Sequence, residues 1–169
     1  MTVREIRLFG DPVLKSVCDP VVHFDQTLAL LAQDLLDTTT QISGRAGVAA
    51  NQIGISLRAF SWNVDGKSGV IFNPRIVELT GERHLVQEGC LSVPNLWHET
   101  PRYEYARVEG FDQAGEPVVL EGTGLMAQAL QHECDHLDGL VYLDRLEPAE
   151  RKLAMRELRE QEWFIRKSL

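Results

Sequence analysis

Hydrophobic residues near the start of the chain recur at the spacing of one face of an α-helix. Within residues 25–43 the apolar positions follow the pattern i, i+3, i+4, i+7, and they are Leu28, Leu31, Ala32 and Leu35. Asp25 is suited to cap the start of this helix, and Gly44 is suited to follow its end. The pattern predicts an N-terminal helix with a structural role.

Two apolar runs in the middle of the chain, 57–64 and 69–79, have the composition of strands. Asp65-Gly66 between them is typical of a two-residue hairpin turn. Pro74 has no backbone donor, so the second run is expected to lie at a sheet edge or to end near this residue. Further strands are predicted on either side of a turn at 112–115, and they cover residues 103–108 and 118–120.

A second predicted helix, between Gly124 and Gly139, carries the most informative polar residues of the chain. His132 and His136 are four residues apart and therefore lie on one face, close enough to bind a single metal ion. Glu133 lies beside them, where its carboxylate can accept a proton from a water molecule on the metal. This H-E-x-x-H arrangement predicts a catalytic metal site.

The same helical face carries Ala129 and Leu125, one and two turns before His132. We therefore expect the imidazoles to point from an apolar stripe into the protein. Two core histidines, each satisfied by a hydrogen bond, are the structural alternative. The glutamate between the pair favours the metal site over this alternative.

A last helix is predicted from Ala149 to Ile165, directly after Glu147-Pro148. From Arg151 to Leu169 there are six basic and three acidic residues, a net charge of +3. Such a helix usually presents a solvated face, and the same charge would favour a weak contact with an anionic partner.

The composition is that of a globular protein, because 44% of the 169 residues are hydrophobic and 25% are charged. This length suits a single domain spanning residues 1–169. The net charge of −8 disfavours nucleic acid as the main ligand, since phosphate binding needs a basic surface. We expect neither a signal peptide nor a membrane-spanning segment. The three cysteines, an odd number, fit a reducing cytoplasm or a metal thiolate better than a disulfide framework.

A catalytic metal site needs a third protein ligand and one open position. The extended motif H-E-x-x-H-x-x-G-x-x-H would put a histidine at position 142, which is Tyr142. Glu157 follows at a distance that would suit a small metallopeptidase with a glutamate ligand. Cys90 is the other candidate, because it lies in a glycine-containing turn and its thiolate would leave a divalent ion one net positive charge. Elsewhere, the small residues of 44–54 let the backbone approach a ligand closely, and the Gln52 amide can donate a hydrogen bond to an oxyanion.

Three short motifs occur along the chain in one order. Residues 47–52 (GVAANQ) match the end of G-x-G-x-A-A-x-Q, residues 88–92 match E-G-C-L-S, and residues 131–139 match Q-H-E-x-D-H-L-x-G. Arg45 replaces the first glycine of the first motif. Together the motifs resemble the peptide deformylase family over nearly the whole chain. The resemblance implies an α+β fold in which antiparallel strands pack around the central helix, with an N-terminal and a C-terminal helix.

The resemblance also implies the parts of the active site. The implied metal ligands are Cys90, His132 and His136. A metal-bound water would attack the formyl group of formyl-methionyl nascent polypeptides and release formate, with Glu133 as general base and then general acid. The Gln52 amide and the Leu91 backbone N–H would bind the oxyanion. The metal would be a single divalent ion, natively Fe(II), with zinc, nickel or cobalt able to occupy the site.

Substrate binding and surroundings follow from the same resemblance. The implied substrate-binding residues are Gly47, Val86, Leu125 and Ala129, with the Gly47 backbone pairing with the peptide as an added strand. The enzyme would be cytoplasmic, and its basic C-terminal helix would make a weak contact with the ribosome. We further expect Glu88 to pair with Arg102 and to hold the loop of the thiolate. A non-catalytic metal- or peptide-binding module is the rival from another class of protein.

Overall fold

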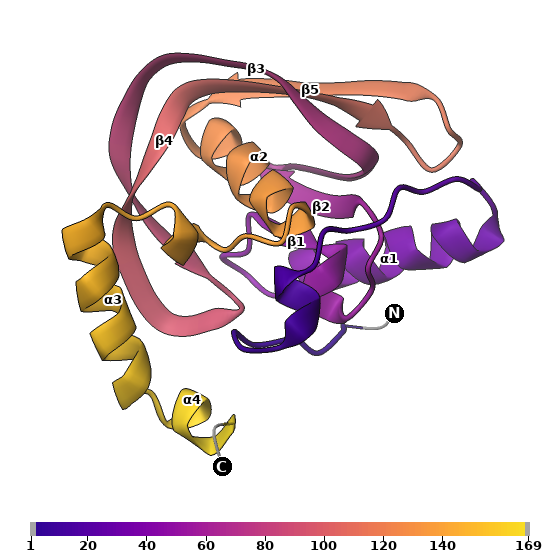
Figure 1. The fold of residues 1–169 in the computed structure, drawn as a ribbon. Coiled ribbons are helices and arrows are strands. Elements are labelled where there is room, and N and C mark those ends of the chain that lie inside the picture. The colour runs from indigo at the N-terminus through magenta and orange to yellow at the C-terminus, as the bar shows by residue number, and fades with distance from the viewer. Residues whose placement is uncertain (1–2, 168–169) are drawn as a thin grey trace.

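The computed structural model describes residues 3–167 and shows a curved antiparallel sheet that wraps around a central helix (Figure 1). Over these residues the sheet has five strands in the order β1-β2-β3-β4-β5, which are Gly47–Ala49, Ala59–Val64, Lys67–Cys90, Val93–Phe111 and Pro117–Thr123. The helices are α1 (Gln26–Thr40), α2 (Gly124–Leu137), α3 (Pro148–Glu160) and α4 (Glu162–Lys167). The α+β class predicted from the sequence is therefore confirmed.

The central helix α2 is held by the concave side of β3, β4 and β5, which curve over it in Figure 1. Its buried apolar residues share one cluster with residues of the sheet: Ala127, Leu130, Cys134 and Leu137 pack with Phe60, Ile71, Ala106 and Val108. The predicted helix matches α2 closely. Gly139, with φ +76°, follows its end, where a Cβ atom would lie 2.7 Å from the Lys15 carbonyl oxygen.

The strands β3 and β4 form a hairpin far longer than the sequence predicted. Residues 80–90 are mostly exposed and polar, so they do not look like a strand, yet they pair with β4 because one face of an antiparallel sheet can be solvated. The glycine-containing turn expected around Cys90 is reduced to Leu91 and Ser92. Pro74 lies inside β3, which continues to Cys90, so the expectation of a strand end was wrong. It lies just beyond Phe72, where the pairing with β2 ends, and at a shift in the β3–β4 register between Phe72 and Arg75. At Pro74 the strand is therefore paired with β4 on one side only, which agrees with the expected edge position.

Two predicted helix ends also differ from the structure. Asp25 caps α1 as expected, because its side chain accepts hydrogen bonds from the backbone of Thr27 and Leu28. The helix nevertheless ends at Thr40, before Gly44. The predicted C-terminal helix is divided at Gln161, whose backbone is extended. This break turns α4 back onto the body, where Trp163 Nε1 donates to the Pro94 carbonyl oxygen at 3.2 Å.

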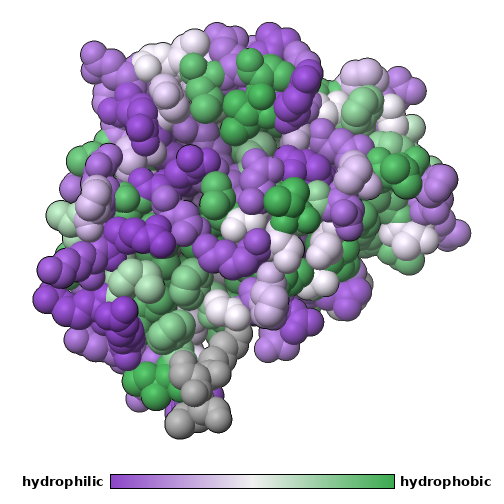
Figure 2. All heavy atoms as spheres, in the orientation of Figure 1, coloured by the Kyte–Doolittle hydropathy of each residue, from purple (hydrophilic) through white to green (hydrophobic). Residues whose placement is uncertain are grey.

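Hydrophilic residues predominate on the face shown in Figure 2, and hydrophobic residues form small separate groups. None of the helices within residues 3–167 has the length and apolar character needed to cross a membrane. The chain's basic C-terminal stretch is described only as far as residue 167, and Ser168 and Leu169 lie outside the described residues.

Candidate metal centre

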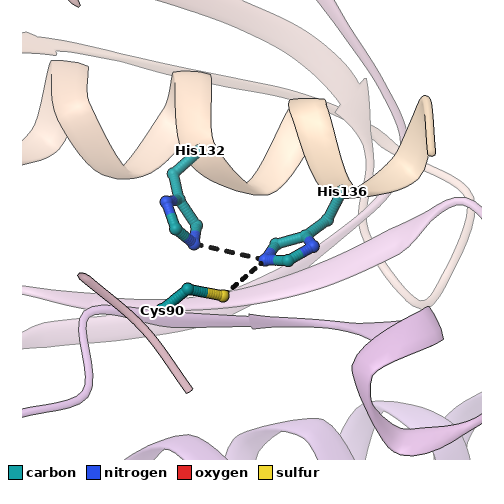
Figure 3. Close-up of side chains that lie close together, drawn as sticks. All are labelled: Cys90, His132 and His136. Atoms are coloured by element: carbon teal, nitrogen blue, oxygen red, sulfur yellow. Dashed lines mark hydrogen bonds between the residues drawn. The ribbon is translucent and has the colours of Figure 1, made fainter. Parts of the chain in front are cut away.

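Three side chains from two distant parts of the sequence meet beside α2 (Figure 3). Cys90 is the last residue of β3, whereas His132 and His136 project from successive turns of α2. The Nε2 atom of His136 lies 3.2 Å from Cys90 Sγ and 3.2 Å from His132 Nε2. The three potential ligand atoms all lie within 4.8 Å of one another.

This donor set fits a divalent transition metal. A thiolate and two imidazole nitrogens at bond lengths near 2.0–2.3 Å in tetrahedral geometry would be separated by roughly 3.3–3.5 Å. The two separations of 3.2 Å from His136 Nε2 are close to this range. Three protein ligands leave one coordination position for water or substrate. Since all three cysteines of the described chain are free thiols, Cys90 is available as a ligand.

The position of Cys90 depends on the glycine before it. Gly89 pairs with Trp97 across the β3–β4 hairpin, and the indole lies against the Gly89 backbone. A Cβ atom on residue 89 would come within 2.8 Å of the ring. Glycine therefore allows the indole to cover this turn while Cys90 faces the two histidines.

Burial disfavours the charged form of both imidazoles, but the two rings respond differently. In His136, burial together with the neighbouring His132 lowers the pKa well below its ordinary value, so this ring is neutral as a metal ligand must be. In His132, the neighbouring Cys90 and Glu88 outweigh burial and raise the pKa well above its ordinary value. Metal binding at His132 would therefore displace a proton.

Glu88 orients His132 from the side opposite the ligand atoms. Its Oε1 lies 2.6 Å from His132 Nδ1, which leaves Nε2 directed towards Cys90 and His136. Arg102 donates to both carboxylate oxygens of Glu88, at 2.9 and 2.6 Å, so the predicted pairing is confirmed. Burial would raise the pKa of Glu88, but Arg102 and His132 outweigh it and hold the pKa at about 2. In known metal sites, a ligating histidine commonly donates its other ring N–H to a carboxylate, which fixes the orientation of the ring, and Glu88 lies in this position relative to His132.

Glu133 is buried next to the two histidines and faces the backbone of β1. Burial raises its pKa to about 7. Its Oε2 atom is buried and has no hydrogen-bond partner among the described residues. A Cβ atom on Gly47 would lie 2.5 Å from Glu133 Oε1, so the absence of a side chain at Gly47 makes room for this carboxylate. A carboxyl group with a pKa near neutrality can both accept and donate a proton at that pH.

Gln52 presents its amide nitrogen to the same place. It lies in a short 3₁₀ helix, Ala50–Ile53, and its Oε1 accepts a hydrogen bond from the Ala49 backbone at 2.9 Å. Its Nε2 donates to Ser92 Oγ at 3.1 Å and lies 3.6 Å from Cys90 Sγ. The side chain is therefore held with its donor group towards the centre.

A cavity of about 490 Å³ opens in front of these residues. Of the predicted substrate-binding residues, Gly47, Leu125 and Ala129 line it, and so does Leu91. Leu125 lines the cavity and is 51% exposed. The apolar face of α2 that carries Leu125 and Ala129 was expected to be buried, and it therefore reaches the surface at Leu125. Val86 is half-buried in β3 and is not among the residues that line the cavity.

The structure adds residues that sequence reasoning missed. Trp97, 67% exposed, lines the cavity opposite Gly89, and only the register of the long hairpin could have revealed it. Glu157, the alternative third ligand, lies on α3 with its Oε2 3.2 Å from His98 Nε2. It is not part of the group formed by Cys90 and the two histidines.

Comparison with known proteins identifies the family. The family model for polypeptide deformylase matches residues 3–152. The chain is 50% identical over 163 residues to a peptide deformylase of Acidothermus cellulolyticus, covering 96% of this chain and 89% of that protein. It is 47% identical to peptide deformylase 1 of Corynebacterium glutamicum, covering 97% and 99%. The crystal structure of peptide deformylase from Thermus thermophilus superposes with a TM-score of 0.87 at 40% identity, covering 94% and 95%. The chain thus belongs to the polypeptide deformylase family, and it is a metal-dependent hydrolase that removes the formyl group from nascent polypeptides.

Proposed function

We propose that Cys90, His132 and His136 hold the single divalent metal ion of this hydrolase. The observation that carries the proposal is the meeting of one sulfur and two Nε2 atoms within 4.8 Å, with Glu88 behind His132. A divalent ion bound there would supply Lewis-acid chemistry, lowering the pKa of a water molecule and polarising the formyl carbonyl.

Glu133 moves the proton in this proposal. Its carboxylate accepts a proton from the water whose oxygen attacks the formyl carbon, and then gives that proton to the amine nitrogen as the C–N bond breaks. Formate and a peptide with a free amino terminus leave. The buried position of Glu133, with a pKa of about 7, suits both halves of this exchange.

Two donors meet the negative charge that develops on the formyl oxygen. Gln52 Nε2 is already directed at the centre, because Gln52 Oε1 accepts a hydrogen bond from the Ala49 backbone and Nε2 donates to Ser92. The backbone N–H of Leu91 follows Cys90 in the turn between β3 and β4. Preorganised donors of this kind stabilise the transition state because they need no rearrangement when charge develops.

The cavity supplies the substrate site. Leu125 and Ala129 offer apolar surface for a methionine side chain beside the histidines. The strand β1 lies at the edge of the sheet, so Gly47 can pair with the peptide backbone as an added strand. Val86 lies outside the cavity lining and would contribute only through neighbouring residues of β3.

The proposal also covers the identity of the metal, the cellular compartment and a contact with the ribosome. We propose that the native metal is Fe(II) and that the enzyme works in the cytoplasm as one catalytic domain over residues 1–169. The C-terminal stretch, net +3 from Arg151 to Leu169, would make a weak contact with the ribosome. Of that stretch, the side chain of Lys167 and all of residues 168–169 lie outside the described residues.

The test is formate release from a formyl-methionyl peptide by protein purified without oxygen, with metal analysis of the same sample. We expect one metal ion per chain and rapid formate release. Cys90→Ser should lose both metal and activity. Full activity in that variant would contradict the proposed site, because it would leave the chemistry independent of the thiolate.

A further inference from the structure

A chain of ion pairs connects the candidate metal centre with the protein surface at Arg145. At its outer end, Arg145 donates from Nη2 to Asp135 Oδ1 at 2.7 Å and from Nε to Asp135 Oδ2 at 3.1 Å. The side chain of Arg145 is 45% exposed, whereas that of Asp135 is only 7% exposed. Arg145 follows the short 3₁₀ helix Tyr142–Asp144, and its backbone N–H donates to the Tyr142 carbonyl at 2.9 Å, so its position is fixed.

The inner end of the chain reaches a metal ligand. Asp135 Oδ2 accepts a second hydrogen bond, from Arg102 Nη1 at 2.7 Å. The other two donors of Arg102, Nε and Nη2, hold Glu88, and Glu88 Oε1 lies 2.6 Å from His132 Nδ1. Each link is a charged hydrogen bond between groups with defined geometry.

With His132 neutral, as it must be to bind a metal, the charges of this chain balance only when Arg145 is included. Glu88, Arg102 and Asp135 are all buried, at 3%, 4% and 5% exposure. Two carboxylates and one guanidinium carry a net charge of −1, and Arg145 brings the sum to zero. Without Arg145, Asp135 would depend on Arg102 alone, and the two carboxylates would compete for one buried guanidinium.

We propose that Arg145 is a positioning residue for the metal centre, acting through Asp135, Arg102 and Glu88 on the orientation of His132. Partial neutralisation of Asp135 by Arg145 leaves Arg102 free to hold Glu88 with two parallel bonds, which fixes the imidazole behind its ligating nitrogen. This inference rests on the proposed metal ligands, but it adds a surface residue that touches neither metal nor substrate.

The structure offers a matched control. Arg4 is also half-exposed, at 50%, and it donates from Nε and Nη2 to Asp34, whose side chain is 16% exposed. Asp34 lies on α1, which carries no proposed metal ligand. Arg4→Met and Arg145→Met therefore each remove a half-exposed arginine that donates two hydrogen bonds to an aspartate, and only the second pair is connected to His132.

The readout is metal binding, measured by competition with a chelator, together with the absorption spectrum of the Co(II)-loaded protein. Supporting residues of a metal site typically affect affinity 10- to 100-fold, and we expect Arg145→Met to weaken metal binding by about tenfold and to shift the Co(II) bands. Arg145→Lys keeps the charge but not the two-bond geometry, so it should lose less. Arg4→Met should bind and absorb like the wild type. In an Asp135→Asn background, Arg145→Met should cause no further loss.

Three results would overturn the inference: wild-type affinity and spectrum in both Arg145 variants, an equal loss in Arg4→Met, or independent losses at Arg145 and Asp135. The same measurements distinguish a failure of the Arg145 inference from a failure of the proposed metal site. A wild-type protein that binds no metal through Cys90 contradicts the proposed site, whereas normal metal binding in the Arg145 variants contradicts only the role of Arg145.

Discussion

The chemistry of this site is set by single residues held in unusual surroundings. Glu133 is a carboxyl group whose pKa burial raises to about 7, while Glu88, in the same centre, is held at about 2 by Arg102 and His132. Two glutamates of identical intrinsic chemistry are therefore suited to different roles, and the roles we propose are proton exchange for Glu133 and support of His132 for Glu88. At many active sites, different surroundings give two carboxyl groups different pKa values in this way.

Replacing Glu133 by Gln tests its role directly. Glutamine cannot exchange the proton, so we expect a loss of about 10²- to 10⁴-fold in kcat, the usual contribution of general acid–base catalysis. Metal content should be unchanged, because the proposed ligands remain. Metal analysis and formate release on the same preparation check both statements. Unchanged turnover in Glu133→Gln would exclude Glu133 as the proton acceptor. If the wild-type protein bound metal and peptide but released no formate, it would be a non-catalytic binding module.

The three thiols should differ in reactivity. Burial raises the pKa of Cys18 to about 11 and also raises that of Cys134, so neither forms a thiolate readily at pH 8. Cys90 lines the cavity. In folded, metal-depleted protein we expect Ellman's reagent to modify Cys90 first, and prior addition of Zn²⁺ should protect it. Faster modification of Cys18 or Cys134 would contradict this order, as would a Cys90 that Zn²⁺ leaves unprotected.

At the scale of elements, the site is the junction of one helix with two strands of the sheet. The helix α2 supplies the histidines and Glu133, the end of β3 supplies Cys90, and β1 faces the Glu133 carboxylate. β1 and residues 67–72 of β3 both pair with β2, so the proposed substrate edge and the strand that ends in Cys90 belong to one sheet.

Gly47→Ala tests the contact between β1 and Glu133. The new methyl group would lie 2.5 Å from Glu133 Oε1, so the carboxylate must move. A misplacement of this size lowers kcat/KM by about 10- to 100-fold. The control is Gly69→Ala, because Gly47 of β1 and Gly69 of β3 both pair with Trp62 of β2. A Cβ atom on Gly69 would lie 3.0 Å from the Trp62 side chain and would not touch Glu133. Equal activity in both variants would show that β1 does not constrain Glu133.

Local sequence patterns predicted the helix that carries the candidate site residues. They did not predict contacts between residues that are distant in the sequence. The spacing of His132 and His136 is a property of one helix, so it could be read from the sequence. The pairing of Gly89 with Trp97 depends on a hairpin whose residues are mostly polar and exposed, and no periodicity marks it. The role of Asp135 was hidden in the same way, because Arg102 and Arg145 are neighbours only in the folded chain.

At the scale of the whole molecule, the C-terminal helix supports the metal site from outside. Ala154 and Leu158 of α3 are fully buried in a cluster with Val93 and Leu96, against which Cys90 packs. His98, which is 2% exposed, lies between Glu150 and Glu157 of α3, at 2.7 and 3.2 Å. The segment that the sequence marked as a solvated basic helix therefore also completes part of the core.

Leu158→Ala measures the contribution of that cluster. Truncation of a fully buried leucine leaves a cavity and should lower the free energy of unfolding by about 2–5 kcal/mol. Leu30→Ala on α1 is the control, since Leu30 is 65% exposed and its truncation should change stability by no more than about 0.5 kcal/mol. Urea denaturation at fixed metal concentration gives both values. Similar small losses in the two variants would mean that α3 is not part of the cooperative core.

We propose that one sulfur and two imidazoles share a cation, and X-ray absorption at the metal edge identifies these ligands. For the zinc-loaded protein we expect one sulfur near 2.3 Å and two imidazole nitrogens near 2.0–2.1 Å. The sulfur contribution should disappear in any zinc that Cys90→Ser retains. A first coordination shell without sulfur, or one in which a carboxylate replaces it, would contradict the account.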